Sequence, residues 1–136
     1  MLGRRFPAQG FFVLRPSAAG DGYDAEASSA SNLGPSSPKL IHQVERRADE
    51  YRAREGLRDG ARVPADAVTA SGSGLDPAIS IANAELQAPR VARQSGLPLE
   101  QVERLIDAHT AGPALGFLGE GYVNATLLNL DLARSR

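Results

Sequence analysis

Two regions rich in small residues constrain this chain more than any other feature. One is Val68–Pro77, which reads VTASGSGLDP, and the other combines RPSAAG at Arg15–Gly20 with ASSASNLGP at Ala27–Pro35. The central small residues of the first region are Ser71, Gly72, Ser73 and Gly74. Glycine allows positive φ angles and the close approach of another backbone, whereas a plain surface turn needs only one or two such residues. The sequence therefore predicts two specific loops that dock onto a partner.

The composition predicts a single small domain and excludes several classes of protein. A length of 136 residues and a mass of 14.3 kDa fit one domain over residues 1–136, and a hydrophobic share of 42% allows a modest core. With a net charge of −1 and a pI of about 6.1, nothing indicates nucleic acid as a partner. The chain has no cysteine, so it has neither a disulfide framework nor a thiolate metal site.

The apolar runs of the chain are too short to span a membrane. The longest clusters, Phe11–Leu14 and Leu127–Leu130, fall far below the roughly 20 apolar residues of a spanning helix. The opening Met1–Arg5 is not followed by the apolar segment of a signal peptide. These observations leave two interpretations open: a soluble cytoplasmic protein, or a fragment whose membrane-spanning part is missing.

The first half of the chain predicts a short strand, a long loop and a helix. Phe11–Leu14 is an apolar run with the length of a strand. Ser17–Pro38 is polar and rich in small residues, and a loop of this length in a small domain is often functional. Apolar residues at helical spacing predict a helix over Pro38–Glu55, with Ser37 as N-cap, a proline at N1 and Gly56 past the end.

The next elements are a short turn and a helix that contains a proline. Val63–Thr69 predicts a turn of helix that leads into a strand. A second helix is expected to begin near Ser80 and to end at Gly96. Because Pro89 lacks an N–H group and clashes with the preceding turn, it is expected either to kink this helix or to start a new one.

A third helix and a strand complete the prediction. The helix covers Pro98–His109, and its apolar face consists of Leu99, Val102, Leu105, Ile106 and His109. Val123–Leu132 alternates in a way that favours a strand over a helix. The predicted fold class is therefore α+β: a single domain with three or so helices packed on one side of a small, mostly antiparallel sheet, with long loops.

A nucleophilic enzyme is one functional hypothesis that the residues allow. Ser71 and Ser73 lie in the glycine-rich region, and His42 and His109 are the only histidines. The G-x-S-x-G pattern of a nucleophile elbow is not matched, because Thr69 and Ser71 stand where glycines are required. His109 lies near a helix C-terminus, where a packed or dipole-stabilised histidine is the usual outcome. A non-catalytic protein is favoured.

Phosphate and metal sites have little support in the sequence. The Gly72–Gly74 turn lacks the Lys-Ser/Thr of a P-loop, and Pro77 stands where a dinucleotide fingerprint requires glycine. Weak anion binding by backbone amides stays open, but a loop that simply packs is favoured. Asp21 and Asp24 match no calcium loop, and the two histidines have no ligand spacing. No metal and no cofactor are expected.

Seven motifs in a fixed order resemble a known family. The motifs are RPSAAG (Arg15–Gly20), YDA (Tyr23–Ala25), SNLGP (Ser31–Pro35), VTASGSGLDP (Val68–Pro77), PRVAR (Pro89–Arg93), LGFLGE (Leu115–Glu120) and VNATLLNLDL (Val123–Leu132). Each motif alone is weak, but the ordered set is specific and spans nearly the whole chain. It closely resembles the C subunit of the Kdp-type potassium-transporting ATPase.

This resemblance implies a membrane location. Members of the family begin with a single membrane-spanning helix, which is followed by a domain outside the cytoplasmic membrane. Met1–Phe6 is similar to the stretch that follows that helix in the family. The chain is therefore expected to be the extracytoplasmic domain of a single-pass protein of the cell membrane, with its N-terminal anchor missing.

The resemblance also implies partners and a role. The family works with a channel-like A subunit, an ATPase B subunit and a small F subunit, and the C subunit assembles and stabilises the complex. The residues expected to dock are Arg15, Ser17, Asn32, Ser71, Gly72, Ser73, Gly74 and Asp76. As an alternative, the family's C subunit raises the ATP affinity of the ATPase subunit, and Gln87 and Arg90 would then contact the nucleotide. A structural role is favoured for both: Gln87 would cap a helix break at Pro89, and Arg90 would pair with an acid.

Overall fold

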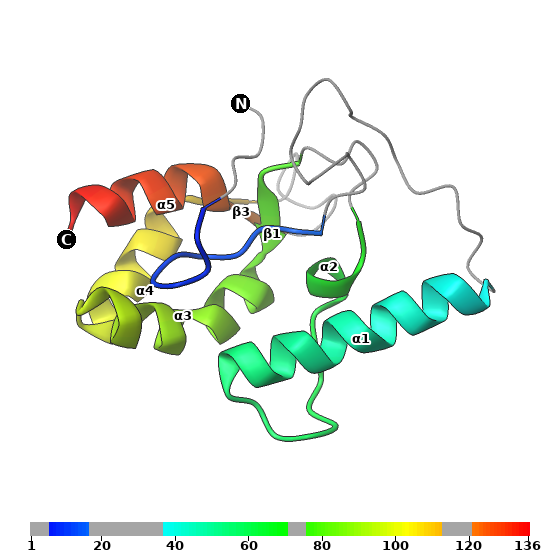
Figure 1. The fold of residues 1–136 in the computed structure, drawn as a ribbon. Coiled ribbons are helices and arrows are strands. Elements are labelled where there is room, and N and C mark those ends of the chain that lie inside the picture. The colour runs from blue at the N-terminus through cyan, green and yellow to red at the C-terminus, as the bar shows by residue number, and fades with distance from the viewer. Residues whose placement is uncertain (1–5, 17–36, 71–75, 113–120) are drawn as a thin grey trace.

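The computed structural model describes residues 6–16, 37–70, 76–112 and 121–136. Within these ranges the chain forms five helices and three short strands (Figure 1). Six residues expected to dock lie outside the described residues, as does almost all of the expected long loop. These six are Ser17, Asn32, Ser71, Gly72, Ser73 and Gly74.

The helix expected over Pro38–Glu55 is confirmed at both ends as α1. Pro38 occupies the first turn, where its missing N–H is tolerated, and Gly56 ends the helix in the left-handed conformation with φ 70°. Ser37 is the N-cap residue, but its side chain makes no capping hydrogen bond. Only Tyr51 and Glu55 of α1 are buried, so the helix packs mainly through its C-terminal half.

Helix α3 runs without interruption from Ile81 to Ser95, after the single-turn helix α2 (Ala65–Val68) and strand β1 (Ala78–Ser80). The expectation that Pro89 starts a new helix is wrong, because Pro89 lies inside α3. Pro89 has no N–H group to donate to the Glu85 carbonyl. The helix tolerates this loss because Pro89 and Glu85 are both exposed and the Glu85 carbonyl can bind water. Gln87 therefore has no helix break to cap.

The strand expected over Val123–Leu132 is wrong for most of its length. Strand β3 covers only Tyr122–Asn124, and helix α5 follows at Ala125–Arg134. The side chain of Asn124 caps this helix by accepting a hydrogen bond from the Leu127 N–H at 3.1 Å. Buried apolar residues then recur at helical spacing, and they are Ala125, Leu128 and Leu132. Burial at this spacing outweighs the local alternation of the sequence.

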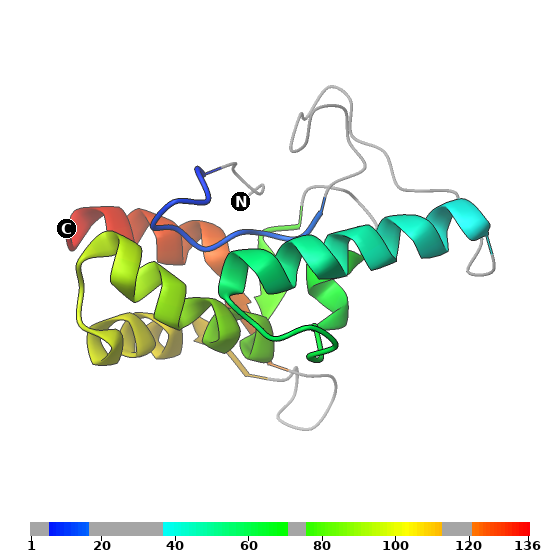
Figure 2. The ribbon, with the colours of Figure 1, turned by 60° about the horizontal axis from the view of Figure 1, so that its bottom comes forward.

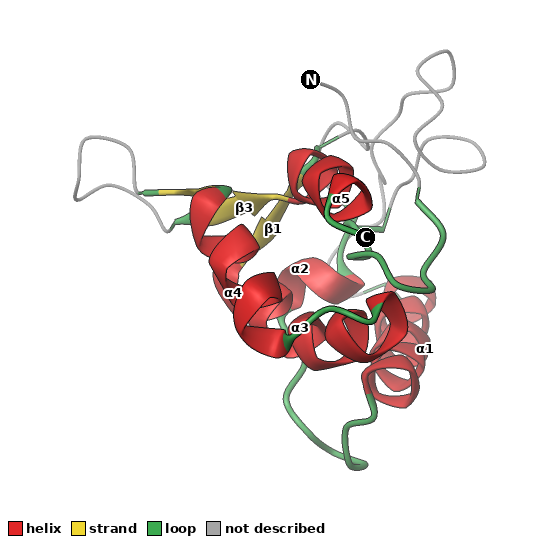
Figure 3. Cartoon of the chain, turned by 90° about the vertical axis from the view of Figure 1, so that its left-hand side faces the viewer, coloured by secondary structure: helices red, strands yellow, loops and turns green. Residues whose placement is uncertain are grey.

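The sheet is antiparallel, with strand order β1-β3-β2, where β2 is Thr110–Ala111. Ile79 pairs with Val123, and both point into the core with exposures of 1% and 0%. Helices α3 and α4 (Leu99–Ala108) lie on one side of this sheet (Figure 3). The predicted α+β class is confirmed.

The core joins the sheet to the helices. Its buried members are Phe12, Leu14, Ile79, Ala84, Ala88, Val91, Ala92, Val102, Ile106, Val123, Ala125, Leu128 and Leu132. On α4, Val102 and Ile106 are buried, Leu105 is partly buried and Leu99 is 41% exposed. The face of α4 that packs is therefore narrower than the sequence predicts. Among the described residues, no helix combines the length and hydropathy needed to cross a membrane.

The N-terminal strap, residues 6–16, turns at residues 8–11 and then continues without regular secondary structure. It is not a strand of the sheet, so the strand predicted at Phe11–Leu14 is wrong. Figure 2 shows the strap, in blue, running from beside α5 toward α1. Phe12 and Leu14 point into the core. Burial therefore alternates along Phe11–Leu14 as it does in a strand, but the strap has no neighbouring strand in the described sheet.

Candidate functional site

Side-chain amides replace a partner strand along the strap. Asn129 of α5 accepts from the Phe12 N–H through Oδ1 and donates to the Phe12 carbonyl through Nδ2, both at 2.8 Å. Gln87 of α3 does the same at Val13, at 2.7 Å to the N–H and 3.0 Å to the carbonyl. Each amide offers one donor and one acceptor to the same residue, as a paired strand would. The sequence missed this arrangement because 74 and 117 positions separate the partners.

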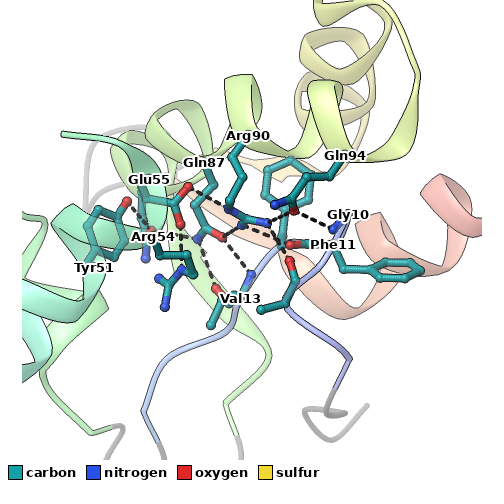
Figure 4. A network of polar contacts seen from close by, with 12 residues as sticks. Gly10, Phe11, Val13, Tyr51, Arg54, Glu55, Gln87, Arg90 and Gln94 are labelled. Atoms are coloured by element: carbon teal, nitrogen blue, oxygen red, sulfur yellow. Dashed lines mark hydrogen bonds and ion pairs between the residues drawn. The ribbon is translucent and has the colours of Figure 1, made fainter.

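Arg90 is the centre of a buried network that joins α3, α1 and the strap (Figure 4). Its side chain is 3% exposed, and each N–H of its guanidinium has an acceptor in this chain. The acceptors are Glu55 Oε2 at 2.9 Å, the carbonyl groups of Ala8 and Phe11 at 2.6 and 3.1 Å, and the side-chain oxygens of Gln87 and Gln94 at 3.0 and 3.1 Å. The acid that pairs with Arg90 is therefore Glu55, whose side chain is fully buried.

The network continues from Gln87 to α2. Gln87 Nε2 donates to Asn83 Oδ1 at 2.9 Å, and this oxygen also accepts from the Tyr51 hydroxyl at 3.0 Å. Asn83 in turn donates to Asp66 of α2 at 2.9 Å. Burial raises the pKa of Tyr51 well above its ordinary value, and the charge of Glu55 adds to the effect. We call Tyr51, Glu55, Asn83, Gln87 and Arg90 the polar hub.

The structure brings Gln87 and Arg90 together, but it buries both of them. The predicted nucleotide contact stays a prediction. As the hub stands, the polar atoms of these two side chains already face partners within the chain, and the strap covers them. A nucleotide would have to displace the strap or the Glu55 carboxylate to reach them.

A cleft of about 570 Å³ opens over strands β1 and β3, and we call it the sheet cleft. It is lined by Arg15, Asp66, Asp76, Pro77, Ala78, Ile79, Ser80, Gly121, Tyr122 and Asn124. Two of the residues predicted to dock, Arg15 and Asp76, meet here although they are far apart in sequence. Arg15 Nη1 lies 3.8 Å from Asp76 Oδ2, and these side chains are 25% and 39% exposed.

The floor of the sheet cleft is the face of the sheet opposite the core. Ser80 pairs with Tyr122, and Ala78 pairs with Asn124, one residue to either side of the inward pair. Tyr122 is 46% exposed. A Cβ at Gly121 would lie 3.0 Å from the Ala111 carbonyl oxygen and from Ile81 Cδ1, so a larger residue at this position would require these neighbours to shift.

Two carboxylates cap the outer edge of β1. Asp76 accepts from the Ala78 N–H at 2.9 Å, and Asp66 accepts from the Ser80 N–H and hydroxyl at 2.8 and 2.7 Å. These bonds satisfy edge donors that would otherwise be available to another strand. The sequence alone did not indicate Asp66, Ser80 or Tyr122 as parts of this site. The alternation around Val123 could have revealed Tyr122, whereas no local pattern marks Asp66.

The two histidines have different surroundings, and Ser71 and Ser73, the serines of the nucleophilic hypothesis, lie outside the described residues. His109 ends α4, and its Nε2 lies 2.8 Å from Asp131 Oδ2 of α5. Asp131 also pairs with Arg134 at 3.1 Å. His42 is exposed on α1. In these parts of the chain, no group of three or more potential ligand residues could hold a metal ion.

Comparison with known proteins gives the family. The fold and site together describe a small α+β domain with a closed polar hub and an open cleft. The family model described as "K+-transporting ATPase, c chain" matches residues 1–134. The chain therefore belongs to this family, KdpC, whose members are subunits of potassium-transporting ATPases.

Individual relatives agree with the family match. The Mycobacterium bovis "Potassium-transporting ATPase KdpC subunit" is 56% identical over 133 residues, which cover 98% of this chain and 70% of the relative. Proteins of the same name from Kineococcus radiotolerans and Caulobacter sp. are 52% and 50% identical over 132 residues. Each alignment covers 97% of this chain, with 67% and 66% of the two relatives.

Proposed function

We propose that this chain is a non-catalytic accessory subunit of an ATP-driven potassium uptake complex. It assembles and stabilises the channel-like A subunit, the ATPase B subunit and the small F subunit. Residues 1–136 act as one extracytoplasmic domain, which a single membrane-spanning helix anchors in the cell membrane. Family membership over residues 1–134 supports the complex, and the seven ordered motifs support the partners and the location.

The sheet cleft is the docking surface in this proposal. The observation that carries it is that polar side chains are exposed at the β-sheet, which is a rigid element. Tyr122 is fixed by its pairing with Ser80 and is nevertheless 46% exposed. Arg15 and Asp76 stand beside it as a loose, partly exposed pair. Tyrosine and arginine are enriched at the energetic centres of protein interfaces. The cleft therefore offers anchors that cost little ordering entropy when a partner subunit binds.

The small residues next to Asp76 belong to the same proposal. Gly72 and Gly74 precede Asp76 closely in the sequence, and glycine permits the close approach of a partner backbone. Ser17 follows Arg15 closely in the sequence, and Asn32 lies further along in the small-residue run Ala27–Pro35. Substitution of either glycine by valine is expected to reduce assembly more than it reduces the stability of the domain.

Co-purification with the other pump subunits tests the docking surface. Tyr122→Ala and Asp76→Asn are expected to reduce recovery of the complex while the melting temperature of the domain changes little. Ile41→Ala is the matched control, because Ile41 is 48% exposed and lies on α1, whereas the cleft is lined by other elements. Full recovery with both cleft variants would remove the cleft from the docking surface.

Calorimetric titration with ATP separates this role from the alternative in which the subunit raises ATP affinity. No binding in the micromolar range, about −8 kcal/mol, is expected from the chain alone. The support for this expectation is that Gln87 and Arg90 are 0% and 2% exposed. Micromolar binding that is lost in Arg90→Met, with the fold intact, would favour the nucleotide role.

A further inference from the structure

One carboxylate of the sheet cleft has no counterion among the described residues. Asp66 belongs to α2, lines the cleft and is half-buried. Its oxygens accept from three uncharged donors, which are the Ser80 N–H at 2.8 Å, the Ser80 hydroxyl at 2.7 Å and the Asn83 side chain at 2.9 Å. None of the ion pairs within the described ranges includes Asp66. These bonds fix the position of its negative charge but do not neutralise it.

The other carboxylate of the cleft differs in this respect. Asp76 accepts from the N–H of Ala78, the first residue of β1, and Arg15 of the same chain lies 3.8 Å from it. Asp66 accepts at Ser80, the last residue of β1. The two carboxylates therefore stand at opposite ends of this strand. Within the part of the chain that the structure describes, only the Asp76 end has an ion pair.

An exposed aromatic ring lies at the Asp66 end of the cleft. Ser80 pairs with Tyr122 on one side and is bonded to Asp66 on the other. Tyr122 is 46% exposed, and both Ser80 and Gly121, the residue before Tyr122, are small. Neighbouring strands lie about 4.8 Å apart, so a group placed over Ser80 is within reach of both the carboxylate and the ring. The cleft of about 570 Å³ leaves room for such a group.

A carboxylate beside an aromatic ring selects a cation that carries an N–H donor. A carboxylate pairs with such a cation, and the face of a tyrosine ring attracts positive charge. An ionised carboxylate has about four acceptor positions, and three donors already use three of those of Asp66. The remaining capacity suits one N–H of a lysine or arginine side chain, whereas a hard metal ion requires several oxygen ligands.

We propose that the sheet cleft receives one lysine or arginine side chain of a partner subunit, which lies over Ser80 between Asp66 and Tyr122. This inference rests on the proposed docking function and names the group that the cleft binds. Charge complementarity argues for this occupant, because the incoming cation supplies the counterion that Asp66 lacks within the described residues. The apolar stem of the same side chain packs along the Tyr122 ring.

Affinity for the pump subunits purified without this subunit tests the role of Asp66. Asp66→Asn removes the charge but keeps an acceptor oxygen, and it is expected to weaken binding about tenfold, the effect of losing one hydrogen bond to a charged group. The loss should shrink as salt is raised. Asp59→Asn is the matched control, because Asp59 is exposed and does not line the cleft. Its affinity is expected to equal that of the wild type.

Two substitutions at Tyr122 separate a contact between cation and ring from a general apolar contact. Tyr122→Phe keeps the ring and is expected to retain the affinity. Tyr122→Leu keeps an apolar side chain without a ring face, and it is expected to weaken binding about two- to fivefold. Melting temperatures of the variants show whether a loss of affinity reflects a loss of fold.

A small probe tests the site in the unmodified full chain, so the inference is tested even if Asp66→Asn does not fold. The probe is N-acetylarginine amide, and the control is N-acetylcitrulline amide, which has a similar shape without the charge. At millimolar concentration, the first is expected to shift the NMR signals of the Ser80 and Tyr122 amides, and the second is expected to leave them unchanged.

The outcomes distinguish this inference from the docking proposal. Wild-type affinity in Asp66→Asn beside a damaging Tyr122→Ala would overturn the inference and leave the cleft as a docking surface for another group. Equal responses to the two probes, or wild-type affinity in Tyr122→Leu, would also overturn it. If neither Asp66→Asn nor Tyr122→Ala weakens binding, the docking cleft itself is wrong and the inference falls with it.

Discussion

The polar hub and the sheet cleft contain the same kinds of side chain in opposite circumstances. In the hub, Arg90 and Glu55 are 2.9 Å apart with side-chain exposures of 3% and 0%. In the cleft, Arg15 and Asp76 are 3.8 Å apart with exposures of 25% and 39%. Polar groups that are buried and matched hold the fold together, whereas those left half-exposed on a rigid floor can bind another molecule. The comparison assigns stability to one region and binding to the other.

Removing the buried acid is expected to produce the largest effect on stability. Glu55→Ala leaves Arg90 as a buried charge without its counterion, which costs about 3–5 kcal/mol. Urea unfolding measures the loss. Glu50→Ala is the control, because the Arg46–Glu50 pair is 3.8 Å long and exposed on the same helix, and its loss is expected to stay below about 1 kcal/mol. Equal losses in the two variants would break the distinction between the hub and the surface.

Removing one of the two side-chain amides that hold the strap is expected to produce a smaller loss of stability. Gln87→Leu leaves the N–H and carbonyl of Val13 without their partner, and it also removes the hydrogen bonds of Gln87 with Asn83 and Arg90. Arg90 keeps its other acceptors and its counterion, so the main cost falls at Val13, where each unpaired group costs about 1–3 kcal/mol when it is buried. Because Val13 is only half-buried, the lower end of this range is expected. Hydrogen exchange at the Val13 amide should accelerate. Gln101→Leu on α4 is the control, and unchanged exchange in Gln87→Leu would show that the Gln87 amide does not hold the strap.

The sequence predicts an element well when the residues that determine its structure lie close together in the chain. Helix α1 is predicted to the residue because its signals, a proline at N1 and Gly56 past the end, lie within the helix and next to it. The segment Val123–Leu132 misleads because strand-like alternation and an Asn N-cap compete within ten residues. Tertiary burial decides between them, and the local pattern does not contain it.

The sequence predicts the candidate site only in part, because many of its contacts join residues that are far apart in the chain. Arg15 and Asp76 were predicted to dock because both flank runs of small residues, and they do meet at one cleft. Glu55 and Tyr122 were missed. The partner of Glu55 lies 35 positions away, and Tyr122 gains its place by pairing with Ser80 of another strand. Contacts of this range arise from the fold as a whole, so spacing along the chain does not reveal them.

High pH is expected to weaken the hub through Tyr51. Because burial raises its pKa, the folded state keeps the hydroxyl proton above pH 10, where the unfolded chain loses it. Stability near pH 7 is unaffected, and above about pH 10 this residue lowers it by about 1.4 kcal/mol per pH unit. Tyr51→Phe should remove this part of the slope, whereas Tyr122→Phe, at an exposed position, should retain it. Equal slopes in both variants would mean that Tyr51 is not isolated from water.

The smallest effect on stability is expected in the cleft, at Asp76. Asp76→Asn removes the charge that faces Arg15 but keeps an oxygen that can accept from the Ala78 N–H. A partly exposed pair of this length contributes between 0 and about 1 kcal/mol, so urea unfolding should barely change. Binding to the other pump subunits should nevertheless weaken, and the difference from wild type should shrink as salt rises, because exposed charges are screened. A stability loss as large as that of Glu55→Ala would mean that Asp76 serves the fold rather than a partner. The two regions would then no longer differ in role.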